Sequence, residues 1–357
     1  MKIKLGELTK IKTGKLDANA ASDDGEYPFF TCSKEPLKIS TYSYDCECVL
    51  VAGNGDLNAK YYNGKFDAYQ RTYIIESNGD GRLYLPYLYY FMTQYVQELR
   101  KLSIGGVIKY IKLGNLTNAE IRLPNINRQK EACNELKRIE DIIDKKKAQL
   151  NSLDNLIKAR FVEMFGNDKY ETRTIKDVLR ESFWLMPATP KYIEKGIPYI
   201  TSKNIKNRIL DLDDTKFISE DDYLRISKNR PVKPGDILVS MIGTLGQTAV
   251  VQKDKRFYGQ NVYLLRLNDN IVNTPFFCEF FNSDDVQYKL TGKSNQSTQA
   301  YLKANHVEEL SIPIPPIVVQ NEFASFVAQV DKSKFVIQKS LDKTQLLFDS
   351  LMQEYFG

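Results

Sequence analysis

The chain has 357 residues, of which 42% are hydrophobic and 27% charged, and its formal net charge is +5. This length suggests two domains, and the composition is that of an ordinary soluble globular protein. No apolar stretch approaches the ~20 residues that a membrane-spanning helix needs, and Met1 is not followed by the apolar segment of a secretory signal. We therefore expect a cytoplasmic protein. A lone histidine, and five cysteines without a C-x-x-C pair, argue against zinc fingers, disulfide frameworks and most histidine-based catalysis.

The chain contains an internal duplication. Residues 5–8 resemble residues 175–178 at an offset of 170, and residues 110–166 match residues 301–357 at an offset of 191 without a gap. Matched pairs include Gln70 and Gln260, Pro124 and Pro315, Gln129 and Gln320, and Phe165 and Phe356. The preserved order of the matches argues against chance similarity. Most of the change in offset falls between residues 30 and 49, which indicates that the second copy carries an insertion there.

Each copy begins with short β-branched and aromatic runs that Gly, Asn and Asp separate, which predicts strands and turns. These runs include residues 49–52, 73–75, 237–240 and 262–267. A helical stretch follows in each copy, at residues 86–102 and 275–290. Both stretches open with proline, which suits the first position of a helix.

A heptad pattern ends each copy and predicts a long helix. Apolar residues occupy the seam positions Leu136, Ile143, Leu150 and Ile157 in the first copy and Val327, Ile337, Leu341 and Phe348 in the second. Neither segment contains Gly or Pro, so each predicts a helix roughly 60 Å long. A bundle helix or an intermolecular zipper would show the same pattern, but two matched helices in one chain favour antiparallel pairing with each other.

The predicted fold class is therefore mixed α/β (α+β). Two globular α/β domains, related by a pseudo-two-fold axis, are expected to be separated by a pair of long antiparallel coiled-coil helices. The predicted segments are a first domain at 1–124, a central helix at 125–166, a second domain at 167–315 and a C-terminal helix at 316–357.

No catalytic or metal site is predicted. Gly292-Lys293-Ser294 resembles the end of a P-loop, but position 287 is Gln where the motif requires Gly. Glu135 and Lys137 have a nuclease-like spacing, yet they lie on the heptad helix, where charged residues ordinarily face solvent. His306 has no histidine partner.

Polar and aromatic loops fit a nucleic-acid surface better, because Lys, Arg, Asn and Gln pair with base edges while Ser and Lys bind phosphates. The candidates in the first copy are Lys60, Tyr62, Asn63, Lys65, Gln70, Arg71 and Lys109. Those in the second copy are Lys203, Asn204, Lys206, Arg208, Gln260, Asn261, Lys293, Asn295, Gln296, Ser297 and Gln299. An ordinary solvated loop would explain any one of them, but their recurrence at equivalent places favours a shared role.

This layout resembles the specificity subunit of type I restriction–modification systems. The resemblance rests on two variable domains that are each followed by a similar long helix, and on the runs Val49-Leu50-Val51 and Ile237-Leu238-Val239 before Gly-rich loops. It rests also on the Pro-x-x-x-x-Gln segments that begin at Pro124 and Pro315.

The resemblance implies two target recognition domains that each read one half of a split double-stranded DNA sequence, with the helices as a ruler between them. It also implies a non-catalytic subunit that binds no cofactor itself. Two modification subunits would supply S-adenosylmethionine for adenine methylation, and restriction subunits would use ATP and Mg. Two other classes remain open from the residues alone: a coiled-coil protein scaffold that does not read DNA, and a stand-alone DNA-modifying enzyme.

Overall fold

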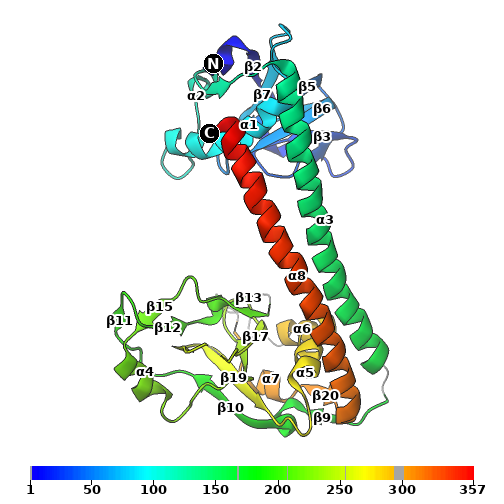
Figure 1. The fold of residues 1–357 in the computed structure, drawn as a ribbon, viewed down its shortest axis with the longest axis vertical. Helices are drawn as coiled ribbons and strands as arrows, with labels where there is room; N and C mark the ends of the chain where they lie inside the picture. The colour runs from blue at the N-terminus through cyan, green and yellow to red at the C-terminus, as the bar shows by residue number, and fades with distance from the viewer. Residues whose placement is uncertain (1, 167–168, 207, 254, 293–300) are drawn as a thin grey trace. The chain divides into compact units, whose positions relative to one another are not determined.

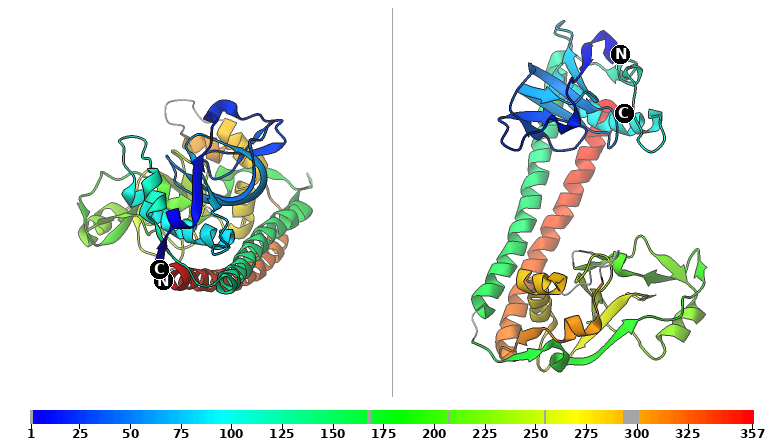
Figure 2. Two further views of the ribbon diagram at one scale, coloured as in Figure 1. Left: turned by 90° about the horizontal axis from the view of Figure 1, so that it is seen from above. Right: turned by 180° about the vertical axis from the view of Figure 1, so that it is seen from behind.

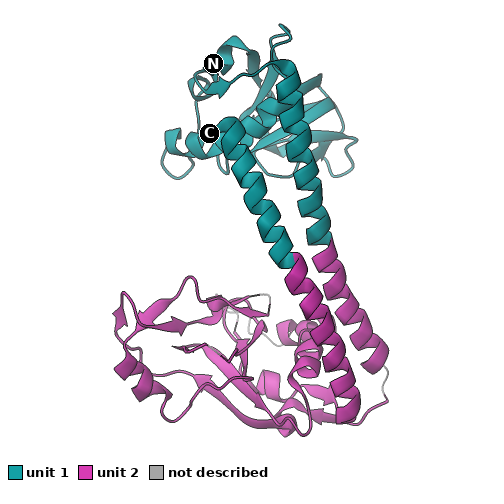
Figure 3. Cartoon of the chain, viewed as in Figure 1, with its two compact units in different colours: residues 1–148, 338–357 teal, residues 149–337 magenta. Residues whose placement is uncertain are grey.

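The computed structural model describes residues 1–357 except 1, 167–168, 207, 254 and 293–300. The chain divides into two compact units, residues 1–148 with 338–357 and residues 149–337 (Figure 3). Two 40-residue helices, α3 (Ile126–Phe165) and α8 (Ile317–Phe356), each contribute to both units (Figure 1). None of the helices in the described part of the chain combines the length and apolar character needed to cross a membrane.

The globular region of the first unit is a curled sheet with one long helix against it. Its strands are β1 (Lys2–Lys4), β2 (Thr9–Thr13), β3 (Tyr27–Phe30), β4 (Leu37–Ile39), β5 (Tyr44–Ala52), β6 (Ala59–Ala68), β7 (Thr72–Ser77) and β8 (Glu120–Arg122). Its helices are α1 (Leu85–Leu102) and α2 (Leu113–Thr117). The sheet order is β2-β7-β5-β6-β3-β4, with β3 and β6 parallel and the other neighbours antiparallel.

Strand β5 is buried on both faces, which explains its uninterrupted apolar run. Val49 and Val51 pack in the same core as Leu88 and Met92 of α1, whereas Leu50 belongs to a second core on the opposite face. Successive side chains point to opposite faces of a strand, so both faces must be apolar when both are covered. Complete burial of each such side chain contributes ~1.5–3 kcal/mol.

The second unit repeats this frame with an insertion. Its strands are β9 (Thr172–Thr174), β10 (Leu179–Leu185), β11 (Tyr192–Ile193), β12 (Ile197–Ile200), β13 (Ile205–Lys206), β14 (Ile209–Leu210), β15 (Lys216–Ile218), β16 (Ile237–Ser240), β17 (Thr248–Val250), β18 (Tyr258–Gly259), β19 (Val262–Leu267) and β20 (Ser311–Pro313). Its helices are α4 (Glu220–Ser227), α5 (Thr274–Phe281), α6 (Asp284–Gly292) and α7 (Ala304–Glu308). The sheet orders are β10-β19-β16-β17 and β11-β15-β12-β18.

Equivalent strands pair in the same way in both units. Phe30 of β3 pairs in parallel with Ala68 of β6, and Ile200 of β12 pairs in parallel with Gly259 of β18. The first unit uses the single strand β6 where the second uses β17 and β18. The strands β13 and β14 and helix α4 lie in the insertion that the change of offset indicated. The predicted mixed α/β class is confirmed.

The helical stretch predicted at residues 275–290 forms two helices, α5 and α6, instead of a single one. The side chain of Asn282 explains the break. Its amide donates to the Cys278 carbonyl (2.7 Å) and to Thr248 Oγ1 (2.8 Å), which closes the last turn of α5. An Asn side chain that bonds nearby backbone competes with helix continuation.

The long helices pair antiparallel within each unit. In the first unit, Lys146 Nζ donates to Ser340 Oγ (2.8 Å) and Tyr355 Oη donates to Glu135 Oε2 (2.6 Å). In the second unit, the Phe323 ring lies 5.5 Å from the Phe165 ring. Of the predicted seam residues, Leu136, Ile143 and Ile157 are buried, while Leu150, Val327, Ile337, Leu341 and Phe348 are half-buried. Lysines at interrupted seam positions reach polar partners on the other helix.

The end of α8 returns to the first globular region. The Phe356 ring lies 4.8 Å from the Tyr87 ring of α1, and Figure 2 shows the last turn of α8 (red) beside α1 (cyan). Arg122 of β8 donates to the carbonyl of Glu354 (3.5 Å), and β8 itself pairs with β1. The first and last described segments of the chain therefore belong to one folded unit.

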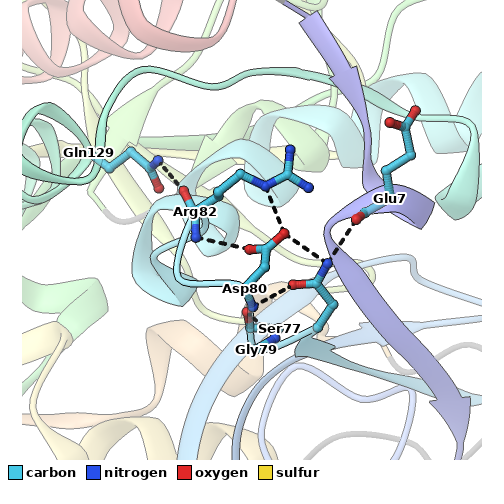
Figure 4. Close-up of polar contacts among 7 residues, drawn as sticks. Glu7, Ser77, Gly79, Asp80, Arg82 and Gln129 are labelled. Carbon is cyan, nitrogen blue, oxygen red and sulfur yellow. Dashed lines mark hydrogen bonds and ion pairs between the residues drawn. The ribbon is translucent and has the colours of Figure 1, made fainter.

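A buried glutamine in the first turn of each long helix ties that helix to its globular region. Gln129 Oε1 accepts the N–H of Tyr84 (2.9 Å), and its Nε2 donates to the carbonyl of Pro124 (2.8 Å). The same Nε2 donates to the carbonyl of Arg82 (2.8 Å), as Figure 4 shows. Tyr84 is the residue that caps the start of α1. Gln129 is 0% exposed, so these bonds satisfy an amide that has no access to water.

The second unit repeats this contact atom for atom. Gln320 Oε1 accepts the N–H of Asn273 (3.0 Å), which caps α5, and Nε2 donates to the carbonyls of Ile271 (2.9 Å) and Pro315 (2.8 Å). Gln320 is also 0% exposed. We call the three bonds of each residue the glutamine clamp.

A polar turn at residues 78–82, just before α1, fixes the backbone to which Gln129 is hydrogen-bonded. Asp80 accepts the backbone N–H of Arg82 (2.9 Å) and its side-chain Nε (2.7 Å), and Asn78 Nδ2 donates to Asp80 (3.0 Å) and to the Glu7 carbonyl (2.9 Å) (Figure 4). These bonds lower the pKa of Asp80 from its usual value, chiefly through the backbone N–H of Arg82. The turn therefore joins the start of the chain, α1 and α3.

Replacement of the clamp residue by an apolar side chain of similar size tests its contribution. We expect Gln129→Met to lower the free energy of unfolding by about 2 kcal/mol, because it leaves one partly buried N–H and two partly buried carbonyls without partners. Urea denaturation measures the change. The matched control is Gln97→Met on the exposed face of α1, which should change stability by less than ~0.5 kcal/mol. Equal effects of the two substitutions would contradict the clamp.

Candidate nucleic-acid interface

Four loops of the first unit meet at one end of its curled sheet. Gly53 N donates to the Arg71 carbonyl (2.8 Å), and Ile111 N donates to the Gly53 carbonyl (2.9 Å). Asn58 Nδ2 donates to the Cys32 carbonyl (2.8 Å). These bonds join residues 31–33, 53–58, 69–71 and 103–111, which we call the first loop cluster. Loops that a rigid sheet holds together are common binding sites.

The second unit gathers the equivalent loops with equivalent bonds. Leu302 N donates to the Met241 carbonyl (2.8 Å), as Ile111 N does to Gly53. Gln260 N donates to the Ile200 carbonyl (3.0 Å), as Tyr69 N does to Phe30 (2.9 Å). Residues 201–204, 241–247, 260–261 and 301–302 form the second loop cluster.

The backbone bonds correct one match between the two copies. Phe30 pairs with Ala68 and accepts the N–H of Tyr69, as Ile200 pairs with Gly259 and accepts the N–H of Gln260, so Tyr69 is equivalent to Gln260 and Gln70 to Asn261. The match of Gln70 with Gln260 is wrong by one position. The reason is that the first turn holds one more residue, Arg71, before the next strand begins.

The predicted residues of β6 lie in different environments. Burial lowers the pKa of Lys60, whose ammonium donates to Asn58 Oδ1 at the edge of the loop cluster. Tyr62 packs against the core ring of Phe30 (5.0 Å). Asn63 and Lys65 are exposed, but they pair with the start of β5, at the far end of that strand from the first loop cluster.

Three predicted residues of the first unit lie in the loop cluster with exposed side chains: Gln70, Arg71 and Lys109. Gln70 Nε2 donates to Asp17 Oδ1 (2.8 Å). For Arg71 and Lys109, the described part of the chain offers no hydrogen bond or ion pair to the side chain. Their charges are therefore available to an external partner.

Two predicted residues of the second unit have internal roles. Asn204 is buried; its Nδ2 donates to the carbonyls of Asp211 (3.0 Å) and Asp214 (3.2 Å), and its Oδ1 accepts the N–H of Thr201 (2.9 Å). Arg208 forms a two-point ion pair with Glu279 of α5 (2.5 and 3.1 Å). Burial opposes the charge of Arg208, but the bonds to Glu279 outweigh it and raise the pKa of Arg208.

The second loop cluster surrounds a cleft of about 620 Å³, which we call the polar cleft. Its walls include the predicted residues Lys203, Lys206, Gln260 and Asn261, together with Asn204. Lys206 lies 3.8 Å from Asp211, also on the wall, so part of its charge is compensated within the cleft. The structure therefore brings the predicted residues of two separate segments, 203–206 and 260–261, into one concavity. The remaining predictions, Lys293, Asn295, Gln296, Ser297 and Gln299, lie outside the described residues.

Sequence reasoning missed Tyr192, Tyr199 and Thr244 on the walls of the polar cleft. Thr244 had a detectable signal, because it lies between Gly243 and Gly246 directly after β16. Both glycines adopt positive φ (79° and 70°), which marks a tight turn. Tyr192 and Tyr199 had none, since an aromatic residue in a strand predicts a core position equally well.

The described residues contain no group of three or more His, Cys, Asp or Glu side chains arranged to hold a metal ion. The site is thus a surface of amides, hydroxyls, lysines and aromatic rings. Such groups recognise a polar ligand by hydrogen bonds and charge.

Comparison with known proteins identifies a family. The model of the type I restriction modification DNA specificity domain matches residues 1–155 and 167–345. The EcoDI specificity subunit of Escherichia coli is 38% identical over 156 residues, which cover 44% of this chain and 34% of that protein. The EcoBI specificity subunit of the same organism is 21% identical over 346 residues, which cover 86% and 71% of the two chains. The chain thus spans about a third of the length of the first of these relatives.

Solved structures show the same fold. The type I restriction–modification S subunit from M. genitalium aligns over 100% of this chain and 96% of its own, with a TM-score of 0.62 and 16% identity. A second chain, from a study of complex assembly and conformational transition in a type I system, aligns with a TM-score of 0.57 and 13% identity. Because the family model covers most of the chain, we conclude that the protein belongs to the type I restriction–modification DNA specificity family.

Proposed function

We propose that this subunit reads a split double-stranded DNA sequence, with one half contacted by each loop cluster. The antiparallel helices α3 and α8 set the gap between the halves. Two modification subunits dock on the protein and use S-adenosylmethionine to methylate adenine, and restriction subunits that use ATP and Mg complete the system. The assembly works in the cytoplasm, and this chain itself carries no cofactor.

The main support for the proposal is that the two units share the same backbone hydrogen bonds but present different side chains. The same backbone bonds build both loop clusters, and the same glutamine clamp attaches each domain to its helix. The side chains presented differ: Gln70 and Arg71 in the first cluster, Gln260 and Asn261 in the second. Two loop clusters with the same backbone but different side chains suit a DNA target whose two halves differ in sequence.

The chemistry of both clusters suits DNA. Exposed Arg71, Lys109 and Lys203 supply positive charge for phosphates or guanine edges, and the amides of Gln260 and Asn261 suit adenine edges. Binding through such charges releases counterions, so affinity should fall steeply as salt rises. A protein scaffold that does not read DNA would show no such dependence on a specific duplex.

Exposed apolar side chains on the long helices support docking of partner subunits. In the first unit Ile142 and Leu346 lie outside the heptad seam and are 44% and 69% exposed. In the second unit Leu156 and Phe335 are 47% and 70% exposed. Apolar side chains that lie outside the seam and remain exposed to solvent are typical of helices that bind another protein. Each unit offers such a surface, which agrees with two modification subunits.

The length of the helices tests the ruler. We expect that one heptad inserted after Leu150, with a matching heptad after Ile337 opposite, lengthens the recognised gap by about three base pairs. Seven helical residues add about 10 Å, and a base pair occupies about 3.4 Å. Sequencing of methylated sites in cells that carry the variant measures gap and half-sites together. The helices would not be a ruler if the half-sites changed while the gap stayed constant.

Independence of the two readers is tested by exchange. Replacement of residues 171–300 by the corresponding segment of another family member should change one half-site and leave the other intact, because each loop cluster is built within its own unit. The same sequencing reads both halves. A change in both half-sites would contradict modular recognition.

Paired arginine variants separate DNA contact from stability. We expect Arg71→Ala to weaken specific DNA binding by ~1–3 kcal/mol with unchanged stability, because its side chain is exposed. Arg208→Ala should instead cost ~2 kcal/mol of stability, since it leaves buried Glu279 without its partner. This cost is below that of a fully buried pair because Arg208 is partly exposed. DNA titrations and urea denaturation of both variants measure the two effects, and a reversed pattern would reassign both residues.

A further inference from the structure

A second hollow adjoins the polar cleft in the second unit. It has a volume of about 290 Å³, and its walls include Trp184, Met186, Ile242, Tyr301 and Leu302. We call it the apolar pocket. Met186 is 62% exposed and Tyr301 is 37% exposed, so the pocket opens to solvent. The first unit has no counterpart of its indole, because Thr13 pairs with Tyr73 where Trp184 pairs with Tyr263.

Asn261 and Ile242 line both hollows and thus form the wall between them. Within the described residues the side-chain amide of Asn261 has no hydrogen-bond partner. Its backbone, in contrast, is fixed: its N–H donates to the Leu185 carbonyl (2.9 Å), and its carbonyl accepts Ser202 Oγ (2.9 Å). A free amide on a fixed backbone is prepared for an external ligand.

The backbone of Asn261 is also unusual. Its φ is +60°, in the left-handed region, and among the described non-glycine residues only Arg208 shares this feature. Asn tolerates this region better than most residues, yet glycine would occupy it more freely. An asparagine kept at such a position, with its amide unpaired, indicates a use for the side chain.

We propose that Asn261 and the apolar pocket together read one A·T base pair in the major groove. This inference rests on the proposed function and names the base that the second loop cluster selects. Asn261 would bond the adenine N6 and N7, and the apolar pocket would receive the 5-methyl group of the paired thymine. Gln260, whose Oε1 accepts a long bond from Tyr199 Oη (3.4 Å), is the adjacent residue and would contact a neighbouring base.

The match is chemical as well as spatial. An Asn side chain forms two bonds with the major-groove edge of adenine, which offers one donor and one acceptor side by side. The thymine methyl is the apolar group that a base pair displays in that groove, and it lies on the same edge of the same pair. The Asn261 amide, which lies between the polar cleft and the apolar pocket, can bond adenine while the pocket receives the thymine methyl group.

Binding selection from a pool of randomised duplexes tests the assignment on the full chain. We expect the wild-type protein to require A·T at one position of one half-site. Asn261→Gly keeps the left-handed backbone without strain and should remove that preference, with an affinity loss of about 5- to 100-fold for the preferred duplex. Asn261→Asp should shift the preference toward C·G, because a carboxylate accepts from the cytosine amino group.

The matched control is Gln70→Ala at the equivalent backbone position of the first unit. It should alter the other half-site and leave the A·T position intact. If the wild-type protein selects a sequence but Asn261→Gly selects the same one, the inference is overturned while the proposed function stands. If the wild-type protein selects no sequence at all, the proposed function fails with it.

Deoxyuridine tests the pocket separately, because it lacks only the methyl group of thymine. We expect its substitution at the A·T position to weaken wild-type binding about fourfold, the value of one buried methyl group. Met186→Ser, an exposed position, should abolish the difference between thymine and deoxyuridine. The chain contains one tryptophan, so fluorescence of Trp184 reports on the pocket directly and should change more with thymine than with deoxyuridine. Equal affinities and equal spectra for the two duplexes would refute the methyl contact.

Discussion

A buried amide in the first turn of each long helix determines the direction in which that helix leaves its globular region. Gln129 and Gln320 each bridge the helix, the segment before it and the capping residue of the domain helix. A helix held only by apolar contacts can rotate or slide over a core at small cost, because the hydrophobic effect has no direction. Three satisfied bonds in the absence of water define one geometry, and a loss of any of them is expensive.

This constraint lets the rest of each domain vary. The strands that carry the loop clusters keep their pairing in both units, although the second contains an insertion with β13, β14 and α4 and divides one long strand into two. The insertion is itself anchored, because Arg208 of its hairpin pairs with Glu279 on α5. The differences between the two units thus lie in segments that do not carry the clamp.

The polar residues of the helix seam show how charge is tolerated between helices. Lys146 and Lys334 occupy seam positions, but their ammonium groups reach Ser340 and Asp154 on the opposite helix. A long aliphatic stem covers the seam while the charged end remains partly hydrated. Such pairs also favour one register, because a helix shifted by one turn would separate them.

The sequence by itself determined the duplication, the mixed α/β class, the strand runs at residues 49–52 and 237–240, and the two long helices. These features follow from local periodicity and from repetition, which can be recognised in the amino-acid sequence alone. Only the tertiary structure decided which polar residues face outward. Asn204 and Arg208 carry the same groups as Asn261 and Arg71, but their partners lie in other segments, and no spacing in the sequence records such contacts. The break between α5 and α6 likewise depends on a hydrogen bond from Asn282 to Thr248, 34 residues away, and such a long-range contact cannot be predicted from local periodicity.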